Sequence, residues 1–348
     1  MDAIPNVVVL GRGAVGTLIA VLLAKAGVDV IRLSSRPGSG VVVLQTGNEL
    51  RSAQVHEMRG LSVLASTSVA CVIVALKVPQ LVHLLPMVVQ HCRPGLPVIL
   101  PQNGLLKWSF PAFSNVPIHH VIADVSVGLE RPGHAVLHSM GGFLSHVSLL
   151  DGMSRDLAIP MQSLGFRGVS AHEFWVAQRV KFLRSTTGAR MAVENLSIGQ
   201  AFASERVRMD LAAIVKEGTH VLVAAMSDCK LSRDLSDAAS RLISPVRDGL
   251  PAARDHAPLD QAFTSLHRDL LRHRYPTEVQ WLNGYISDLG RKLCIPTPLN
   301  DCLLEIVQRM EELGQTPFDV AGDNSIGSRM KQVFAAHHAQ RLADATSV

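Results

Sequence analysis

Gly11-Arg12-Gly13-Ala14-Val15-Gly16 follows a short apolar run at residues 7–10 and precedes a helical stretch that reaches about Ala26. The six residues have the G-x-G-x-x-G spacing, in the order strand, turn, helix that dinucleotide-binding βαβ units use. In that motif the first glycine permits a tight turn, the second lets the backbone approach a pyrophosphate, and the third lets helix and strand pack closely. The stretch therefore predicts a dinucleotide site on residues 11–16, with a purely structural glycine turn as the alternative.

The first half of the chain continues this pattern. Short, nearly all-apolar runs alternate with helical stretches, and they lie at residues 7–10, 28–33, 71–76, 98–100 and 121–127. Such runs are typical of parallel strands covered on both faces. Residues 133–150 alternate between apolar and polar side chains, which predicts antiparallel strands at the sheet edge. We therefore predict an α/β Rossmann domain over residues 1–168, with a parallel sheet and antiparallel edge strands.

From about residue 170 the pattern changes to the 3.6-residue periodicity of helices. The periodic segments lie at roughly residues 172–200, 205–228, 231–245, 257–273, 277–294 and 298–313. No segment in this half reads convincingly as a strand. We therefore predict an all-α C-terminal domain over residues 169–321, for substrate binding and dimerisation. The tail, residues 322–348, is expected to end in a helix with a frayed terminus.

The composition narrows the class of protein. The net charge is +4 with scattered lysines and arginines, which argues against a nucleic-acid surface. No apolar run reaches the roughly 18 residues of a membrane span, and the N-terminus has no signal-peptide pattern. We therefore expect a cytoplasmic protein without a membrane or nucleic-acid partner. The five cysteines form no CxxC pair and the fifteen histidines form no HExxH set, so no disulfide framework and no metal site is expected.

The end of the second predicted strand indicates which dinucleotide is bound. An NAD enzyme usually places Asp or Glu there to accept hydrogen bonds from the ribose hydroxyls. This chain has Arg32-Leu33-Ser34-Ser35-Arg36 instead. Two hydroxyls and a guanidinium suit a 2′-phosphate, because Arg can pair with it through two hydrogen bonds. NADP is therefore favoured over NAD, with Arg36 as an ordinary loop cation as the alternative.

Polar residues also follow two later strands. Lys77 closes the apolar run Ala75-Leu76, and Asn103 lies in Pro101-Gln102-Asn103-Gly104 after the next run. Open α/β sheets bind ligands at the carboxyl ends of their strands. A solvated lysine and an ordinary Asn-Gly turn are the alternatives. Because both residues and the glycine turn are predicted to lie at the same edge of the sheet, a binding site is favoured over these alternatives.

At this point the sequence resembles the ketopantoate reductase (2-dehydropantoate 2-reductase) family, as a divergent member. Besides the glycine turn, the resemblance is carried by Val74–Lys77, Pro101–Leu105, Gly133…His138…Gly141-Gly142, Lys181, Ile295-Pro296-Thr297-Pro298, and above all Pro276-Thr277-Glu278-Val279-Gln280-Trp281-Leu282-Asn283-Gly284. That last run resembles the family's PTE-x-x-x-LNG signature. The resemblance implies an NADPH-dependent oxidoreductase that acts on CH–OH donors. The reaction that it implies is the reduction of 2-dehydropantoate (ketopantoate) to pantoate, a step in pantothenate biosynthesis.

The resemblance also implies roles for particular residues. Lys181 would be the catalytic lysine, stabilising and protonating the carbonyl oxygen, and Glu278 would orient it. Asn103 would position substrate and nicotinamide, and Lys77 would line the cofactor end of the site. Ser265 resembles the serine that binds the substrate carboxylate. A homodimer is compatible with a helical second domain of this kind.

The sequence departs from the family on the helix of the catalytic lysine. Family members that reduce ketopantoate typically carry asparagines four and eight residues after it, where this chain has Ser185 and Ala189. Ser185 stays a candidate substrate-binding residue through its hydroxyl, whereas alanine can neither donate nor accept a hydrogen bond. This leaves the substrate open. The alternatives are a relative that reduces another ketone or an imine, and a non-catalytic NADP-binding regulator in which Lys181 is a surface lysine.

Overall fold

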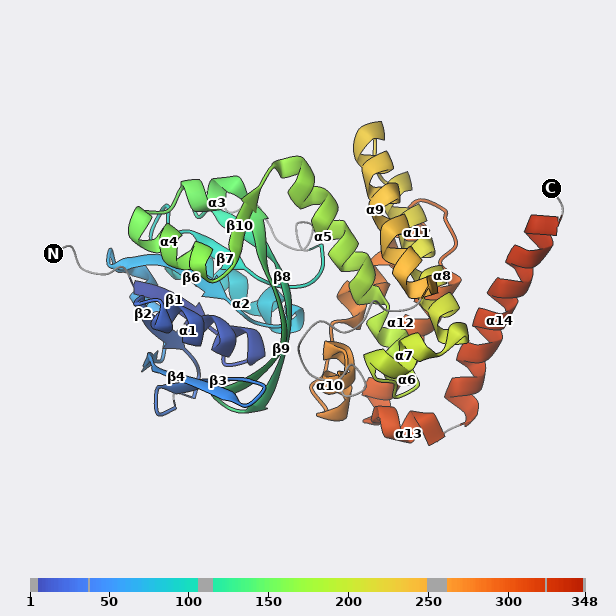
Figure 1. Cartoon of the computed structure of the whole chain (residues 1–348), viewed down its shortest axis with the longest axis horizontal. Coiled ribbons are helices and arrows are strands. Elements are labelled where there is room, and N and C mark those ends of the chain that lie inside the picture. The colour runs from blue at the N-terminus through green and yellow to red at the C-terminus, as the bar shows by residue number, and fades with distance from the viewer. Residues whose placement is uncertain (1–5, 37, 106–114, 249–261, 323, 347–348) are drawn as a thin grey trace. The chain divides into compact units, whose positions relative to one another are not determined.

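The structure is a computed structural model that describes residues 6–36, 38–105, 115–248, 262–322 and 324–346. The chain divides into two compact units, residues 1–177 and 178–348, and each has its own core (Figure 1). The division falls within α5 (Ala171–Thr186). None of the helices in the described residues is long and apolar enough to cross a membrane. The predicted helix over residues 257–273 falls partly on residues 249–261, which lie outside the described residues.

Within the described residues, the strands of the N-terminal unit form one sheet in the order β4-β3-β9-β8-β7-β6-β1-β2-β5, with β10 paired to β9. Pairing is parallel from β8 to β5 and antiparallel between β8 and β9 and between β3 and β4. The strands are β1 (Asn6–Leu10), β2 (Asp29–Leu33), β3 (Val41–Thr46), β4 (Glu49–Gln54), β5 (His56–Met58), β6 (Val69–Val74), β7 (Val98–Leu100), β8 (Ile118–Arg131), β9 (His134–His146) and β10 (Phe166–Val169). This mostly parallel sheet, followed by a helical region, confirms the predicted fold class.

The central strands are apolar because both of their faces are buried. Val7 and Val9 of β1 pack into the core with α1, and Val8 between them points to the opposite face and is equally buried. Apolar side chains on both faces are typical of parallel strands that are covered on each side. The helices of this unit are α1 (Ala14–Lys25), the 3₁₀ helix η1 (Ser62–Ala65), α2 (Val78–His91), α3 (Val147–Asp151) and α4 (Arg155–Ser163).

Four strands, β3, β4, β5 and β10, were not predicted. β4 was missed because its residues are nearly all exposed, so its sequence contains no apolar run. β5 and β10 are only three and four residues long. The antiparallel pairing predicted for residues 133–150 is confirmed, because β9 pairs antiparallel with β8. The predicted position at the edge of the sheet is wrong, because β9 lies between β8 and β3. The antiparallel strand at the edge of the sheet is β4.

The C-terminal unit is helical. The first predicted helix, residues 172–200, is broken into three pieces. The second break occurs because Asn195 has a positive φ of 54° and Ser197 starts a new helix with a capping box. The helices of this unit, with α5, are α6 (Gly188–Val193), α7 (Ile198–Ala203), α8 (Glu205–Ala224), α9 (Cys229–Asp248), α10 (Ser265–Leu271), the 3₁₀ helix η4 (Val279–Trp281), α11 (Asn283–Lys292), α12 (Pro298–Leu313), α13 (Pro317–Gly322) and α14 (Asn324–Thr346). The helix expected near the C-terminus is α14.

Candidate active site

The glycine turn has the geometry that its spacing predicts. A Cβ on Gly11 would lie 2.4 Å from the carbonyl oxygen of Ala75, and a Cβ on Gly16 would lie 2.4 Å from the carbonyl oxygen of Gly11. Both distances are far below van der Waals contact, so only glycine allows β1, α1 and the end of β6 to approach this closely. A Cβ on Gly13, at the N-cap of α1, would meet no heavy atom within 4 Å. The turn is therefore closely packed at its first and third glycines and open at the second, where a pyrophosphate would lie.

This contrast predicts different outcomes for two alanine substitutions. Gly16→Ala should destabilise the N-terminal unit by about 1–3 kcal/mol, because the new methyl group overlaps backbone. Gly13→Ala should leave urea-induced unfolding unchanged but weaken NADPH binding, because its methyl group enters the open space. Urea titration and equilibrium NADPH titration of both variants measure the two effects. A Gly13→Ala protein that binds NADPH as tightly as wild type would favour the purely structural turn.

The loop after β2 brings two arginines together. The Arg12 guanidinium donates from Nη1 to the carbonyl oxygen of Arg36, and its Nε is buried without a hydrogen-bond partner. The Ser34 hydroxyl accepts from the Arg36 backbone N–H at 3.1 Å and so holds the turn. Ser35 and Arg36 are exposed at the same place. The loop thus offers an exposed cationic surface that begins at the glycine turn, which fits the phosphate of a dinucleotide.

An acidic side chain does lie beside this loop, although the sequence places none at the end of β2. Glu57 comes from β5, and its Oε1 accepts from Nε of Arg32 at 2.5 Å while its Oε2 accepts from the Gly38 N–H at 3.2 Å. Both side chains are almost fully buried, at 4% and 1% exposure. Burial lowers the pKa of Arg32, and the bond to Glu57 offsets part of that effect. Glu57 therefore fixes the loop and has little remaining capacity to accept from a ribose hydroxyl.

The other two predicted polar residues of this unit lie beyond the strand ends. β6 ends at Val74, so Lys77 does not close a strand as predicted but is the N-cap residue of α2. Asn103 is half-buried in the turn after β7. Its neighbour Gln102, which the sequence analysis did not single out, donates from Nε2 to the carbonyl oxygens of Val74 and, at 3.1 Å, Leu76. Gln102 thereby ties the turn that carries Asn103 to the end of β6.

In the C-terminal unit, Lys181 is half-buried on α5. The next two residues anchor that helix: Phe182 meets the ring of Tyr285 edge-on at 5.5 Å, and Leu183 packs so tightly on α8 that a Cβ on Gly218 would lie 2.7 Å from it. Glu278 belongs to the same unit and is buried just before η4. The helix that carries Lys181 is therefore held rigidly against α8 and α11.

The two positions that depart from the family pattern differ in their surroundings. The Ser185 hydroxyl donates to the carbonyl oxygen of Lys181 at 2.9 Å, so its proton is used within α5 and its oxygen stays an acceptor. Ala189 is 1% exposed and belongs to the helical core. Two neighbouring polar side chains are not available to replace the missing amides, because the Thr186 hydroxyl donates to the Leu183 carbonyl oxygen and Arg190 is fully buried in ion pairs.

Ser265 is the first residue of α10 and is exposed. Thr264 caps this helix, its hydroxyl accepting from the His267 N–H at 3.2 Å. His267 is itself buried and donates from Nε2 to Asn195 Oδ1 at 2.7 Å, and burial lowers its pKa to about 4. This buried histidine was not predicted, and it ties α10 to the segment after α6.

A buried chain of hydrogen bonds ends at the C-terminus of α5. The Asn283 amide, from the LNG run, donates to the Thr186 carbonyl oxygen at 3.1 Å and to Asn300 Oδ1 at 2.9 Å. Asn300 in turn donates to Glu217 Oε1 through its side chain and its backbone, and Leu299 N–H donates to Oε2. Glu217 of α8 thereby caps the start of α12, whose own N-cap residue makes no side-chain capping bond to the backbone. The chain fixes the end of the helix that carries Lys181.

Glu217 predicts a pH dependence of stability. Burial raises its pKa, and the bonds from Asn300 and Leu299 lower it only in part. Because the folded pKa lies above the unfolded value of about 4.3, the stability from this group is greatest below that value. It is lost as pH rises through the folded pKa. The advantage of wild type over Glu217→Gln in urea unfolding should therefore be smaller at pH 7 than at pH 4. An advantage that grows with pH would mean that the hydrogen bonds outweigh burial.

Comparisons with known proteins agree with this architecture. The family model described as ketopantoate reductase PanE/ApbA matches residues 7–144, and the model of its C-terminal region matches residues 183–311. A 2-dehydropantoate 2-reductase of Streptococcus pyogenes is 24% identical over 322 residues, which cover 88% of this chain and 97% of the relative. One from Vibrio cholerae is 24% identical over 312 residues, with 88% and 98% covered.

Solved structures share the fold. A PanE/ApbA family ketopantoate reductase from Ralstonia eutropha superposes with a TM-score of 0.72 at 21% identity, covering 89% of this chain and 99% of its own. A D-mandelate dehydrogenase solved with NADH and anilino(oxo)acetate reaches 0.70 at 18% identity, with the same coverage. A ketopantoate reductase from Staphylococcus aureus, described as dimeric, reaches 0.65 at 17% identity. The chain thus belongs to the ketopantoate reductase PanE/ApbA family and is a 2-oxo acid reductase of that family, an oxidoreductase that acts on CH–OH groups.

Proposed function

We propose that this protein reduces a small 2-oxo acid to the 2-hydroxy acid with NADPH as the electron donor. The choice of NADPH rests on the loop after β2. There Arg12 of the glycine turn donates to the Arg36 carbonyl oxygen, and Glu57 is occupied by Arg32 and Gly38. A phosphate on the 2′-oxygen would meet the exposed Arg36 guanidinium and Ser35 hydroxyl, while Arg12 and Ser34 hold the loop through the Arg36 carbonyl oxygen. A free ribose 2′-hydroxyl would find no equally available carboxylate at Glu57.

The residues have the following proposed roles. A nicotinamide held at Gly11–Gly16 would supply the hydride that reduces the carbonyl carbon. Lys181 stabilises the negative charge that develops on the carbonyl oxygen and delivers a proton to it, and Glu278 orients the ammonium group. Asn103 and Ser265 hold the substrate, the latter through its carboxylate, while Ser185 offers its hydroxyl oxygen as an acceptor. Gly11–Gly16 and Lys77 bind the cofactor.

The proposed substrate is 2-dehydropantoate, which is the substrate in the names of the curated relatives. Ser185 and Ala189 keep a second candidate open, because together they provide no side-chain amide beside Lys181. Ala189 is buried in α6, so only the Ser185 hydroxyl remains at these two positions to meet a substrate. A 2-oxo acid with an apolar side chain would lose little there, whereas a substrate hydroxyl would lose an amide partner. The D-mandelate dehydrogenase with the related fold was solved with a 2-oxo acid analogue that carries an aromatic ring.

A substrate panel tests the proposal. Oxidation of NADPH and of NADH is followed with 2-dehydropantoate, 2-oxo-2-phenylacetate, 2-oxoisovalerate and a cyclic imine. We expect turnover with the 2-oxo acids and a higher kcat/KM with NADPH than with NADH. A higher kcat/KM for 2-oxo-2-phenylacetate than for 2-dehydropantoate would contradict a role in pantothenate biosynthesis. Turnover of the imine alone would identify an imine reductase. Tight binding of NADPH without turnover of any compound would indicate a regulator.

A further inference from the structure

The C-terminal helix α14 lies beyond the part of the chain that the family model matches, which ends at residue 311. It nevertheless contributes to the helical core, because Met330 and Phe334 are buried among residues of α6, α8 and α12. His338 follows one turn later, so the three side chains share one face of α14 at a spacing of four. We call these three residues the C-terminal clamp.

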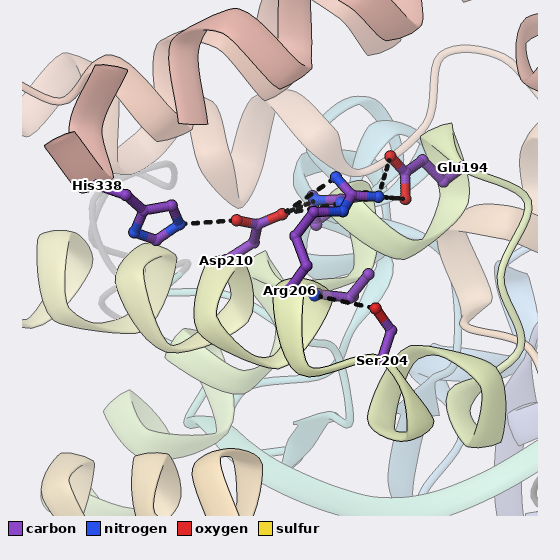
Figure 2. Close-up of polar contacts among 7 residues, drawn as sticks. Glu194, Ser204, Arg206, Asp210 and His338 are labelled. Carbon is purple, nitrogen blue, oxygen red and sulfur yellow. Dashed lines mark hydrogen bonds and ion pairs between the residues drawn. The ribbon is translucent and has the colours of Figure 1, made fainter. Parts of the chain in front are cut away.

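The clamp ends on a cluster of charges around the buried pair Arg190 and Asp210. Nε2 of His338 donates to Oδ1 of Asp210 at 2.9 Å, and the other oxygen of Asp210 accepts from Nε and Nη2 of Arg190 at 3.0 and 2.8 Å (Figure 2). Arg190 also pairs with Glu194 at 2.9 Å, and Arg206 donates to both oxygens of Glu194. Two guanidiniums thus neutralise two carboxylates, and His338 satisfies the remaining oxygen of Asp210.

Burial makes this cluster sensitive to the loss of one member. The Asp210 side chain is 2% exposed and Arg190 is fully buried, with the Phe334 ring 5.6 Å from its guanidinium carbon. Burial by itself would raise the pKa of Glu194, but the charges and hydrogen bonds of Arg190 and Arg206 outweigh it and lower that pKa. Removing His338 would leave one buried carboxylate oxygen without its partner, which is costly in a low-dielectric interior.

Arg190 connects the cluster to the substrate side of the site. It lies on α6, which follows the Lys181 helix after the single residue Thr187. Gly188, the first residue of α6, faces Thr264, whose Cβ would lie 3.6 Å from a Cβ placed there. Thr264 is the cap of the helix that begins with Ser265. α6 therefore joins the ends of the two helices that carry the proposed substrate-binding residues.

We propose that the C-terminal clamp holds α6 in place through Asp210 and Arg190, which makes His338 and Phe334 positioning residues for the 2-oxo acid. This inference rests on the proposed function for its kinetic part. The clamp should affect the substrate and not the cofactor, because the glycine turn and the loop after β2 belong to the N-terminal unit. Its effect on α6 is independent of which reaction is catalysed.

The test uses the full-length chain with His338→Ala, His338→Gln and the control Arg329→Ala. Arg329 lies on the same helix and pairs with Glu305 at 2.6 Å, but both side chains are more than half exposed. In His338→Ala, KM for the 2-oxo acid should rise about fivefold, a size typical of mutations that act through a coupled network, while KM for NADPH stays unchanged. Glutamine can still donate to Asp210, so His338→Gln should have a KM for the 2-oxo acid close to that of wild type. Arg329→Ala should behave as wild type.

Hydrogen exchange supplies the second readout. Amides of α6 should exchange about tenfold faster in His338→Ala than in wild type, while those of α1 stay unchanged as an internal control. A His338→Ala protein with a lower melting temperature, but with wild-type exchange in α6 and wild-type KM values, would overturn the proposal and leave α14 as a structural helix. If wild type reduced no 2-oxo acid, the proposed function would fail, and the exchange rates of α6 would still decide whether the clamp exists.

Discussion

Replacing Lys181 with methionine should lower kcat/KM for the 2-oxo acid about 10³-fold, a loss within the range for removal of a positioned proton donor. Methionine keeps most of the aliphatic stem, and Phe182 and Leu183 still anchor α5 to α11 and α8. The protein should therefore remain folded and should still bind NADPH. What is removed is the ammonium group that stabilises the charge developing on the substrate oxygen. Steady-state kinetics with an NADPH titration would separate the two effects.

A matched control is available on α11. Lys292 is an exposed lysine of the same unit, so Lys292→Met removes one positive charge without touching the proposed site. It should keep kcat/KM within about twofold of wild type, as expected for a screened surface charge. If kcat/KM fell equally and only slightly in both variants, Lys181 would be a surface lysine without a catalytic role. That result would also remove the strongest reason for assigning the catalytic role to α5.

The features that could be predicted from the sequence are local. The glycine turn occupies six consecutive residues, and its first and third glycines each have a separate steric reason that follows from their place between strand and helix. The central strands could be predicted from their nearly all-apolar runs, and the longer helices from their 3.6-residue periodicity. β4 could not be predicted in this way, because an exposed strand needs no apolar side chains and is recognised only by its partner β3.

The features that could not be predicted depend on residues distant in sequence. Glu57 meets Arg32 only because β5 pairs with β2, and nothing in the composition of residues 56–58 indicates this. His338 and Asp210 are 128 residues apart. Buried polar groups find partners because leaving them unsatisfied is costly, but the identity of the partner follows from the tertiary fold. The site residues proposed from the family resemblance stay predictions until the substitutions are measured.

Replacing Arg36 with alanine should raise KM for NADPH about 10- to 100-fold, the range expected when a charge-assisted hydrogen bond to phosphate is lost. KM for NADH should change little, because NADH has no 2′-phosphate for the guanidinium to bind. Arg12→Ala should raise KM for NADPH as well. It should also affect NADH modestly, since the Arg12 guanidinium holds the loop through the Arg36 carbonyl oxygen. The two arginines are coupled in this way, so the double variant should lose less than the product of the single effects.

Arg59, an exposed arginine just after β5 in the same unit, provides the matched control for this experiment. Arg59→Ala should leave both KM values unchanged, which would show that loss of a positive charge near the sheet is insufficient. A second check is ionic strength. The NADPH preference of wild type should weaken as salt is added, because exposed charges are screened, and that salt dependence should be smaller in Arg36→Ala. If Arg36→Ala raised KM for NADPH and for NADH by the same factor, Arg36 would be an ordinary loop cation and the assignment of NADPH would lose its main support.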